Sequence, residues 1–475
     1  MAARRHELQL AAWAAVLACV LAAAAVGAAT GRSTMFVGVA GAGAAAAAVA
    51  LALQAQPAWP LSLGIAAAVF SGNSAYMGLP VSPDRVLILA GLGSFVVRRW
   101  MQQDRGERPA PLRVEGVHWL LFVAGLWAIG SAWAADTLTE SASLFGLLDR
   151  FGLVPFLMFL LAPLVFATER ERRILLGVLV GLGAYLGFTA ICEGIGLDAL
   201  VWPKYILDES VGIHSDRARG PFVEAEANGL ALFGCAIAAT MGVATWRERP
   251  RIRLACGLVA MLCVVGTLFT LSRGVWLAAG LATAIAILIV PGLWRKMVPA
   301  LLVVAMVMAA SVSVIPGLQD SLDRRGGDDT TVWSRSNTNN AALRMIAERP
   351  LEGFGWQRFQ RSSAPYFVQA ATYPMNGIGD GAHNVFLSNA SELGLPGAFL
   401  WFAGFTLAIG GALVRRAPPE LRLWRAGLLT YLIAWLVIAN VTPLAFAFPT
   451  LLLWTWAGVV WSGRHRQTES RTVPA

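Results

Sequence analysis

The chain has 475 residues, of which 57% are hydrophobic and only 14% are charged. Charged residues normally make up about a quarter of a soluble domain, so this composition excludes a water-soluble globular protein. The net charge is +9, but the basic residues lie between apolar runs, which indicates membrane topology rather than nucleic-acid binding. The five cysteines form no CxxC pair and predict neither a disulfide framework nor a metal site.

Apolar runs recur along the whole chain, and most are long enough to cross about 30 Å of hydrocarbon. The sequence therefore predicts an all-α, polytopic membrane protein with about 12–14 transmembrane helices and a helical outer cap. The first run follows Arg4 and Arg5 and is interpreted as an uncleaved first helix. We expect spans at residues 10–29, 34–54, 60–78, 85–97, 116–135, 148–167, 174–192, 227–246, 254–271, 274–293, 297–315, 384–413, 426–441 and 446–462.

Basic clusters between the expected spans predict the orientation of the chain. With an even number of spans and a cytoplasmic N-terminus, all the clusters lie on one side, as the positive-inside rule requires. Arg and Ala far outnumber Lys and Asn, which is typical of a GC-rich bacterial genome. We therefore expect one membrane domain, residues 1–475, in a bacterial cytoplasmic (inner) membrane with both termini in the cytoplasm. The clusters are Arg4-Arg5, Arg98 to Arg113, Arg170 to Arg173, Arg247 to Arg253, Arg295-Lys296, Arg415 to Arg425 and Arg464 to Arg471.

Longer polar segments are expected on the outer side, at residues 193–226 and in a large outer loop at residues 316–382. Within the large loop, Asn339 to Arg349 is predicted to form an amphipathic helix that ends at Pro350. Leu343, Ile346 and Ala347 would lie on its apolar face. Aromatic rings follow this helix and suit a sugar-binding surface, but anchoring at the membrane interface explains Trp and Tyr equally well.

Polar motifs at span ends on the outer side supply candidate ligands for an anion. Arg273 lies in a tight turn between two apolar runs, where the ordinary alternative is an arginine that snorkels to the headgroups. Guanidinium groups hold diphosphates through paired hydrogen bonds, so Arg217, Arg219 and Arg273 together could hold a pyrophosphate. The motifs are His214-Ser-Asp-Arg-Ala-Arg-Gly-Pro-Phe leading to Asn228, Thr270-Leu-Ser-Arg-Gly-Val-Trp, and Gly381-Ala-His-Asn.

His383 stands directly before an apolar segment and beside the large outer loop. A lone histidine near a span end more often has a structural role, but an imidazole with a pKa near neutrality can also accept a proton from a sugar hydroxyl. Glu392 follows about two and a half turns later, roughly on the opposite helix face, and is expected to pair with another helix or to fix its own. Because the sequence lacks Walker, HExxH, GxSxG and Asp-rich motifs, we expect metal-independent chemistry that needs no cofactor and uses an activated lipid donor.

At these residues the chain resembles the O-antigen ligase/polymerase family of bacterial integral-membrane glycosyltransferases. The resemblance covers residues 217–397, with its pieces in the expected order. Where the family commonly has a Pro-Asn pair, however, this chain has Glu224-Ala-Glu-Ala-Asn. The matching pieces are Arg217-Ala-Arg-Gly-Pro-Phe with Asn228, Leu271-Ser-Arg-Gly, Arg335 leading to Ala342, Pro350-Leu-Glu-Gly-Phe-Gly-Trp, His383-Asn-Val-Phe-Leu and Glu392-Leu-Gly-Leu-Pro-Gly.

The resemblance implies transfer of a glycan from undecaprenyl diphosphate to an acceptor hydroxyl on the outer face, with inversion at the anomeric carbon. It implies that Arg273 and either Arg217 or Arg219 bind the donor diphosphate, and that His383 activates the acceptor or helps to seat the donor. Asn384, Arg335 and Glu392 would support this site. The implied partners are an undecaprenyl-diphosphate-linked glycan, a glycan or lipid A-core acceptor and the lipid bilayer, with a chain-length regulator as an open candidate and no nucleic acid.

Several functions remain open from the sequence. A polymerase extends one lipid-linked repeat with another, whereas a ligase moves the finished glycan to lipid A-core or to a protein; the span count and the moderate outer loop favour a polymerase by analogy. A lipid-linked sugar transporter or flippase should carry charges at mid-membrane on broken helices, whereas the span centres here look nearly free of ionisable residues. A structural assembly partner would tolerate substitution of the arginines and the histidine.

Overall fold

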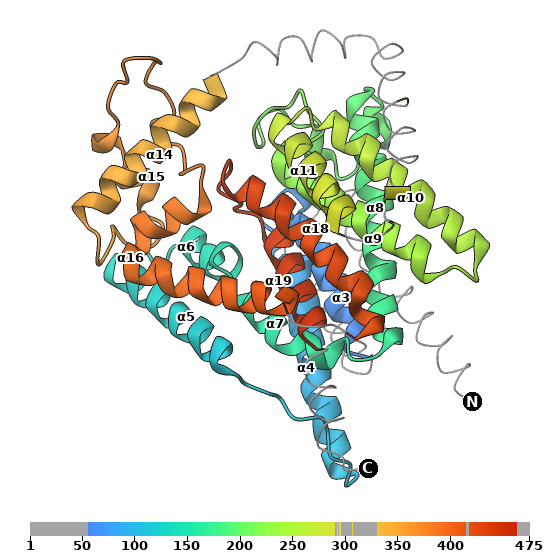
Figure 1. The fold of residues 1–475 in the computed structure, drawn as a ribbon. Coiled ribbons are helices and arrows are strands. Elements are labelled where there is room, and N and C mark those ends of the chain that lie inside the picture. Colours follow the sequence, from blue (N-terminus) through green and yellow to red (C-terminus); the bar gives the residue numbers. More distant parts are fainter. Residues whose placement is uncertain are drawn as a thin grey trace, which may run out of the picture.

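The computed structural model describes residues 56–289, 330–414 and 418–462, together with the isolated positions 292, 294, 295 and 306. These residues form helices joined by turns and loops, and no strand occurs among them (Figure 1). Seven helices are long and apolar enough to cross a membrane, and three shorter apolar helices accompany them within the described ranges. The predicted all-α, multi-pass architecture is therefore confirmed. The expected spans at 10–29 and 34–54, and that at 297–315 apart from Met306, lie outside the described residues.

The described helices follow the predicted spans to within a few residues at most boundaries. Exceptions are the span expected at 60–78, whose helix ends at Phe70, and that at 148–167, which begins earlier at Ser141 through a π-helical segment. A third exception is the span expected at 85–97, whose helix continues to Asp104 and is not among the described helices that are apolar enough to cross a membrane. The helices are α3 (Ala58–Ala67, continued by η1, Ala68–Phe70), α4 (Pro83–Asp104), α5 (Gly116–Ala134), α6 (Ser141–Phe145), η3 (Gly146–Phe151), α7 (Leu153–Val165), α8 (Glu169–Gly194), α9 (Ala225–Thr245), α10 (Pro250–Phe269), α11 (Arg273–Ile289), α14 (Thr330–Glu348), α15 (Phe359–Ser362), α16 (Val385–Phe405), η8 (Thr406–Gly410), α17 (Gly411–Val414), α18 (Arg422–Ala439) and α19 (Ala447–Trp461). Short 3-10 turns are η2 (Ser74–Met77), η4 (Asp198–Leu200), η5 (Lys204–Leu207), η6 (Gly220–Phe222), η7 (Ala364–Tyr366) and η9 (Pro419–Leu421).

Helix α19 forms the centre of the bundle. All its residues from Ala447 to Trp461 are buried, as expected for a helix that is apolar on every side. It packs against α7, α9 and α18. Nearby, α8 and α10 approach closely because Gly187 faces Leu262, where an added Cβ would lie 2.9 Å from the Leu262 carbonyl carbon. Small residues of this kind allow close helix contact in membranes.

Loops from distant parts of the sequence meet at one end of the bundle, called here the site end. Asn73 donates to the carbonyl of Pro221 at 3.0 Å, and the amide of Ala218 donates to the carbonyl of Phe269 at 2.9 Å. The Thr442 hydroxyl lies 3.3 Å from the Glu224 carboxylate. The site end therefore joins the loop before α9, the turn between α10 and α11, and the loop between α18 and α19.

Residues 330–382, the cap segment, contain α14 and α15 and extend to one side of the bundle (Figure 1). Helix α14 packs on α16, which lies alongside α5. Helix α14 begins at Thr330, nine positions before the helix expected at 339–349, and ends at Glu348 before Pro350. Its early start has a tertiary cause, because the Asn337 side chain donates to the Pro374 carbonyl at 3.0 Å and to Asn376 Oδ1 at 2.9 Å.

The predicted apolar face of α14 was wrong. Leu343 is 51% exposed and Ala347 is also exposed, whereas Ala341, Ala342 and Met345 are buried. The buried positions continue the helical spacing from Thr338, so the inner face of α14 carries small residues and one methionine. Small side chains let the helix lie close to α16, and the larger Leu343 faces outward.

The expectation that the span centres are nearly free of ionisable residues was also wrong. Asp149 and Arg150 lie within the apolar segment Ser141–Val165, and Glu392 lies within Val385–Val414. Each charge is paired, because Arg85 binds Asp149 and Arg150 binds Glu392. Buried charges persist in proteins when they are paired and hydrogen-bonded, which explains how the segment accommodates them.

Candidate functional site

Glu226 is the hub of the polar groups at the site end. It lies in the first turn of α9 and is buried. The hydroxyl of Ser272 donates to Glu226 Oε1 at 3.3 Å. The same oxygen lies 3.7 Å from Arg217 Nη1 and 3.9 Å from Arg335 Nη2. One carboxylate therefore joins the loop before α9, the α10–α11 turn and the cap segment.

The two arginines of the motif before α9 have different surroundings. Arg219 is 1% exposed and donates to the backbone carbonyls of Val211 at 2.6 Å, Ile206 at 2.9 Å and Asp208 at 2.6 Å. It thus cross-links its own loop. Arg217 instead lies against Glu226, and its side chain is 5% exposed. Of the two arginines that the sequence left open, only Arg217 contacts the Glu226 hub.

Contacts along both sides fix the loop that carries Arg217. Glu193, near the end of α8, accepts from the amides of Arg219 at 3.0 Å and Gly220 at 3.1 Å. Asn228 donates to the carbonyl of Ala218 at 3.1 Å. Gly220 has a φ of +52°, and a Cβ there would lie 2.5 Å from Asn228 Oδ1, so both the conformation and the space require glycine. Asn228 therefore shapes this loop rather than the reacting centre.

Arg273 is the first residue of α11 and is exposed. The turn before it is sharp, with Leu271 at a φ of +47°. The Thr270 hydroxyl and the Trp276 indole both donate to the Thr267 carbonyl, at 2.7 Å and 3.1 Å, and so hold the end of α10 against the start of α11.

Arg273 also lies close enough to Arg335 to affect its titration. Burial lowers the pKa of Arg335, the carboxylate of Glu226 opposes that shift and the positive charge of Arg273 adds to it. Guanidinium groups from α11 and α14 therefore share one region of the site end. Like charges held close together favour the binding of an anion between them.

His383 immediately precedes the N-cap of α16. The cap residue, Asn384, accepts from the amides of Phe386 at 2.9 Å and Leu387 at 3.0 Å, and it donates to Asn440 Oδ1 at 3.0 Å. Asn440 donates in turn to the Leu436 carbonyl at 2.8 Å. Asn384 therefore fixes the backbone beside the histidine and ties it to the end of α18.

The surroundings of the His383 imidazole favour its neutral form. Burial lowers its pKa below the ordinary 6.5 and the charge of Arg335 lowers it further, while the carboxylates of Asp380 and Glu226 oppose the shift. At neutral pH the ring is therefore uncharged, and one of its two nitrogens carries no proton. An imidazole in this state can accept a proton from a hydroxyl group.

Two glutamates at the start of α9, Glu224 at its N-cap and Glu226 in its first turn, were not predicted as site residues. In the sequence, Glu224 and Glu226 stand out only as a departure from a family pattern, although they are a pair of carboxylates at the start of an otherwise uncharged apolar span. Burial, followed by the charge of Glu226, raises the pKa of Glu224 to about 8, against the hydrogen bond from Thr442. Acidic residues at the start of an uncharged span were the signal that could have identified them.

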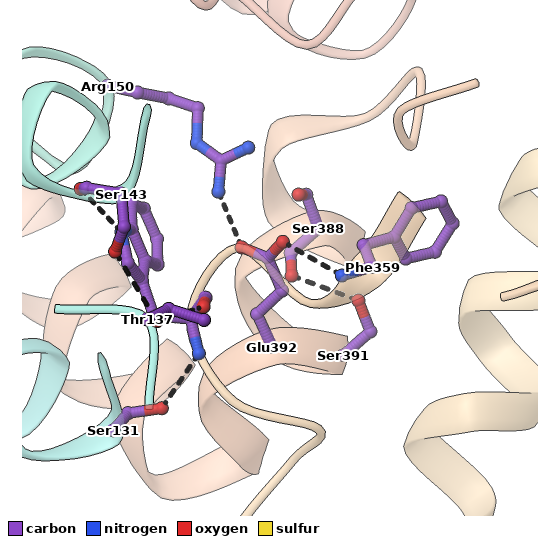
Figure 2. A network of polar contacts seen from close by, with 9 residues as sticks. Ser131, Thr137, Ser143, Arg150, Phe359, Ser388, Ser391 and Glu392 are labelled. Atoms are coloured by element: carbon purple, nitrogen blue, oxygen red, sulfur yellow. Dashed lines mark hydrogen bonds and ion pairs between the residues drawn. The ribbon is translucent and has the colours of Figure 1, made fainter. Parts of the chain in front are cut away.

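Glu392 belongs to a second polar network (Figure 2). It pairs with Arg150 of η3 and accepts from the amide of Phe359 at 3.3 Å. The Arg150 guanidinium lies over the Trp356 ring, 4.4 Å from its centroid. The Trp356 amide donates to Ser131 Oγ at 3.1 Å, and its carbonyl accepts from the Thr137 hydroxyl at 2.9 Å. This network fastens the cap segment to α5, η3 and α16.

The structure thus divides the residues that the sequence singled out. Arg217, Arg335 and Ser272 contact Glu226, while Arg273 and His383 each interact electrostatically with Arg335. Asn384 adjoins His383, whereas Arg219 and Glu392 are held by other partners. Within the described ranges, no group of three His, Cys, Asp or Glu side chains is placed to hold a metal ion.

Comparison with known proteins gives one family. Residues 257–402 match the family model described as O-antigen ligase, and this range contains Arg273, Arg335, His383, Asn384 and Glu392. It begins after Arg217 and Arg219. The search of curated proteins found no match. Residues 257–402 of this multi-pass membrane protein are therefore similar to the O-antigen ligase domain family, whose enzymes transfer lipid-linked glycans as ligases or polymerases.

Proposed function

We propose that the protein transfers a glycan from an undecaprenyl-diphosphate carrier to an acceptor hydroxyl on the outer face of the bacterial cytoplasmic membrane, and that it polymerises cell-surface polysaccharide repeats. One observation carries this proposal. Cationic groups from three separate segments, Arg217, Arg273 and Arg335, gather with a neutral His383 at one end of a membrane bundle. Anion binding and proton acceptance are the two tasks that such a transfer requires.

In this mechanism the arginines bind the donor. Arg217, Arg273 and Arg335 bind the diphosphate through charge-assisted hydrogen bonds, which are the strongest that a guanidinium makes. As the bond between the anomeric carbon and the phosphate oxygen breaks, negative charge grows on that oxygen. Positive groups already in place stabilise this charge without having to reorganise during the reaction.

His383 activates the acceptor. Its neutral imidazole accepts the proton of the attacking hydroxyl while that oxygen bonds to the anomeric carbon from the side opposite the diphosphate. Undecaprenyl diphosphate leaves, the anomeric configuration inverts and the proton remains on His383 until it passes to water. The chemistry then needs orientation, a base and stabilisation of the leaving group.

The proposed orientation follows from the charges at the other end of the bundle. Loops on either side of the long helices alternate between the two ends, so the arginine-rich segments at 98–113, 170–173 and 247–253 lie away from the site end. The positive-inside rule assigns such segments to the cytoplasm. The site end would then face outward, with both chain termini in the cytoplasm.

Charges within the membrane segments do not favour a transporter. Arg85, Asp149, Arg150 and Glu392 pair with one another, and Glu392 also accepts from the amide of Phe359. The Arg150–Glu392 pair fastens the cap segment to the bundle, as a structural element does. The cationic groups proposed to bind substrate gather at the site end, as in an enzyme acting at the membrane interface.

A ligase is the second candidate function, because the family model that matches residues 257–402 is described as O-antigen ligase. A direct test uses the purified protein in lipid nanodiscs with the undecaprenyl-diphosphate-linked repeat unit of its own organism. A ladder of lengthening lipid-linked products supports the polymerase. Transfer that occurs only after lipid A-core is added supports the ligase, and absence of transfer with either acceptor contradicts the proposed function.

A further inference from the structure

Glu226 places a negative charge where the proposed function needs a site for an anion. Its carboxylate is buried in the first turn of α9 and faces Arg217 and Arg335, two of the three arginines assigned to the donor diphosphate. A carboxylate fixed in such a position must repel a bound diphosphate or move aside for it. Its presence therefore requires an explanation beyond donor binding.

The contacts of Glu226 with the two arginines are loose. The separations of 3.7 Å and 3.9 Å are those of ion pairs, whereas a charge-assisted N–H to oxygen hydrogen bond is roughly 2.7–2.9 Å long. Ser272 gives the only hydrogen bond to this carboxylate within the described residues, at 3.3 Å. An incoming phosphate oxygen can thus form shorter bonds to both guanidinium groups than Glu226 does.

Arg217 has donor capacity that Glu226 does not use. Its Nε is buried and has no hydrogen-bond partner among the described residues, although the side chain is only 5% exposed. A buried guanidinium N–H left unpaired is costly, so its presence indicates a missing acceptor. A diphosphate, with oxygens on two phosphorus atoms, can supply acceptors to both edges of this guanidinium at once.

We propose that Glu226 is an exchangeable counter-ion that neutralises Arg217 and Arg335 while the site is empty and competes with undecaprenyl diphosphate for them, so that the spent carrier is released after transfer. This inference rests on the proposed function and concerns the turnover of the same site. Glu226 is a positioning residue in this scheme. It forms no bond to the substrate, and no proton is transferred to it.

The scheme predicts a particular kinetic signature for Glu226→Gln. The amide keeps the shape and can still accept from Ser272, but it removes the negative charge. Undecaprenyl diphosphate should then bind more tightly, on the order of tenfold, because the charged competitor is gone. The KM for the lipid-linked donor should fall together with kcat, because product release becomes slow, and inhibition by added undecaprenyl diphosphate should strengthen.

Other roles for Glu226 give different signatures. If the carboxylate served only to hold the fold, its loss would weaken carrier binding and lower the thermal stability. If it were the catalytic base, Glu226→Gln would lower kcat without tightening the binding of the carrier. Tighter binding of the product together with slower turnover therefore separates the counter-ion from both alternatives.

The experiment measures binding of undecaprenyl diphosphate to the full-length protein in nanodiscs, for wild type, Glu226→Gln, Glu226→Ala and Arg217→Ala. Glu209→Gln, an exposed glutamate in the loop before α9, is the matched control and should bind like wild type. Glu226→Ala provides a second route if the glutamine variant does not fold, which gel filtration and thermal unfolding would reveal. Both Glu226 variants are expected to bind more tightly, and Arg217→Ala more weakly.

The outcomes separate this inference from the proposed function. If Arg217→Ala weakens binding while the Glu226 variants bind equally or less well than wild type, the counter-ion role is wrong and the diphosphate site stands. If Arg217→Ala binds like wild type, the diphosphate site itself is wrong and the inference falls with it. If Glu209→Gln tightens binding as much as Glu226→Gln, a general loss of negative charge explains the effect and overturns the assignment to Glu226.

Discussion

The guanidinium of Arg335 on α14 lies 3.9 Å from the carboxylate of Glu226 on α9 and connects the cap segment to the membrane bundle. The same carboxylate faces Arg217 and Ser272, which belong to two further segments. The cationic region at the site end therefore depends on the docking of α14. A donor diphosphate bound there would contact both the bundle and the cap segment, which links substrate binding to the position of the cap segment.

Arg273 provides the most direct test of the proposed diphosphate site. Arg273→Ala should lower transfer by about 10²-fold or more, as expected when a group that stabilises developing negative charge is removed. Arg273→Lys should restore only part of the activity, because an ammonium cannot form the paired hydrogen bonds of a guanidinium. Arg344→Ala, at an exposed position on α14, is the control and should keep nearly normal activity.

Initial rates in nanodiscs, with membrane insertion checked by gel filtration, measure these effects. Full rescue by lysine would mean that charge alone is sufficient at this position. Normal activity of Arg273→Ala would remove the residue from the mechanism.

Substitutions of the two arginines before α9 should have different effects on the protein. Arg217→Ala should leave a folded protein that binds the donor poorly. Arg219→Ala should instead destabilise the protein, because three backbone carbonyls lose their donor and an unsatisfied buried polar group costs about 1–3 kcal/mol. Thermal unfolding and donor binding, measured on both variants, distinguish the two roles. A stable Arg219→Ala protein that has lost only donor binding would reverse the assignment.

The activity should depend on pH through His383. Its pKa lies below 6.5 in the folded protein, so the ring is neutral and able to accept a proton at pH 7. Transfer should fall as the pH drops through that pKa, since protonation removes the base. The positive charge of Arg335 lowers this pKa, so in Arg335→Gln the acidic limb of the pH–rate profile should move to higher pH.

Profiles normalised to each variant's maximal rate isolate this shift from the loss of donor binding in Arg335→Gln. Arg344→Gln, on the same helix, should leave the acidic limb in place. An acidic limb that does not move in Arg335→Gln would show that a group other than His383 controls the profile.

The Arg150–Glu392 pair should contribute to the stability of the protein and not directly to the chemical step. Arg150→Met or Glu392→Leu alone leaves one buried charge without its partner and should cost about 3–5 kcal/mol. The double variant removes both charges and should recover much of that loss. Thermal unfolding, together with limited proteolysis of the cap segment, measures the effect. Equal stability of the single and double variants would mean that the pair does not hold the segment.

The fold was largely predictable because hydrophobic runs of membrane length carry their own signal. The helices α8, α9 and α10 lie close to the positions expected from composition alone. The apolar face of α14 was not predictable in the same way. Ala341 and Met345 are buried against the bundle while Leu343 is exposed, and this choice depends on how closely α14 approaches α16, which local periodicity does not encode.

The site was predictable only in part. Arg273 and His383 stood out because each is a polar side chain at the boundary of an apolar run. The difference between Arg217 and Arg219 depends on which backbone carbonyls surround each side chain. The sequence, in which the two arginines lie two positions apart, does not show these surroundings. Glu226 was missed because its importance comes from contacts with Ser272 and Arg335, which are distant in the sequence and meet only in the folded chain.

His383 and the arginines around it are proposed to catalyse glycan transfer from a lipid diphosphate. The most direct measurement follows product length on a gel for wild type and His383→Ala in nanodiscs supplied with the undecaprenyl-diphosphate-linked repeat unit. We expect a ladder of products for wild type and its loss in a folded, inserted His383→Ala protein. A ladder of the same length, formed at the same rate by both proteins, would contradict the catalytic role of His383.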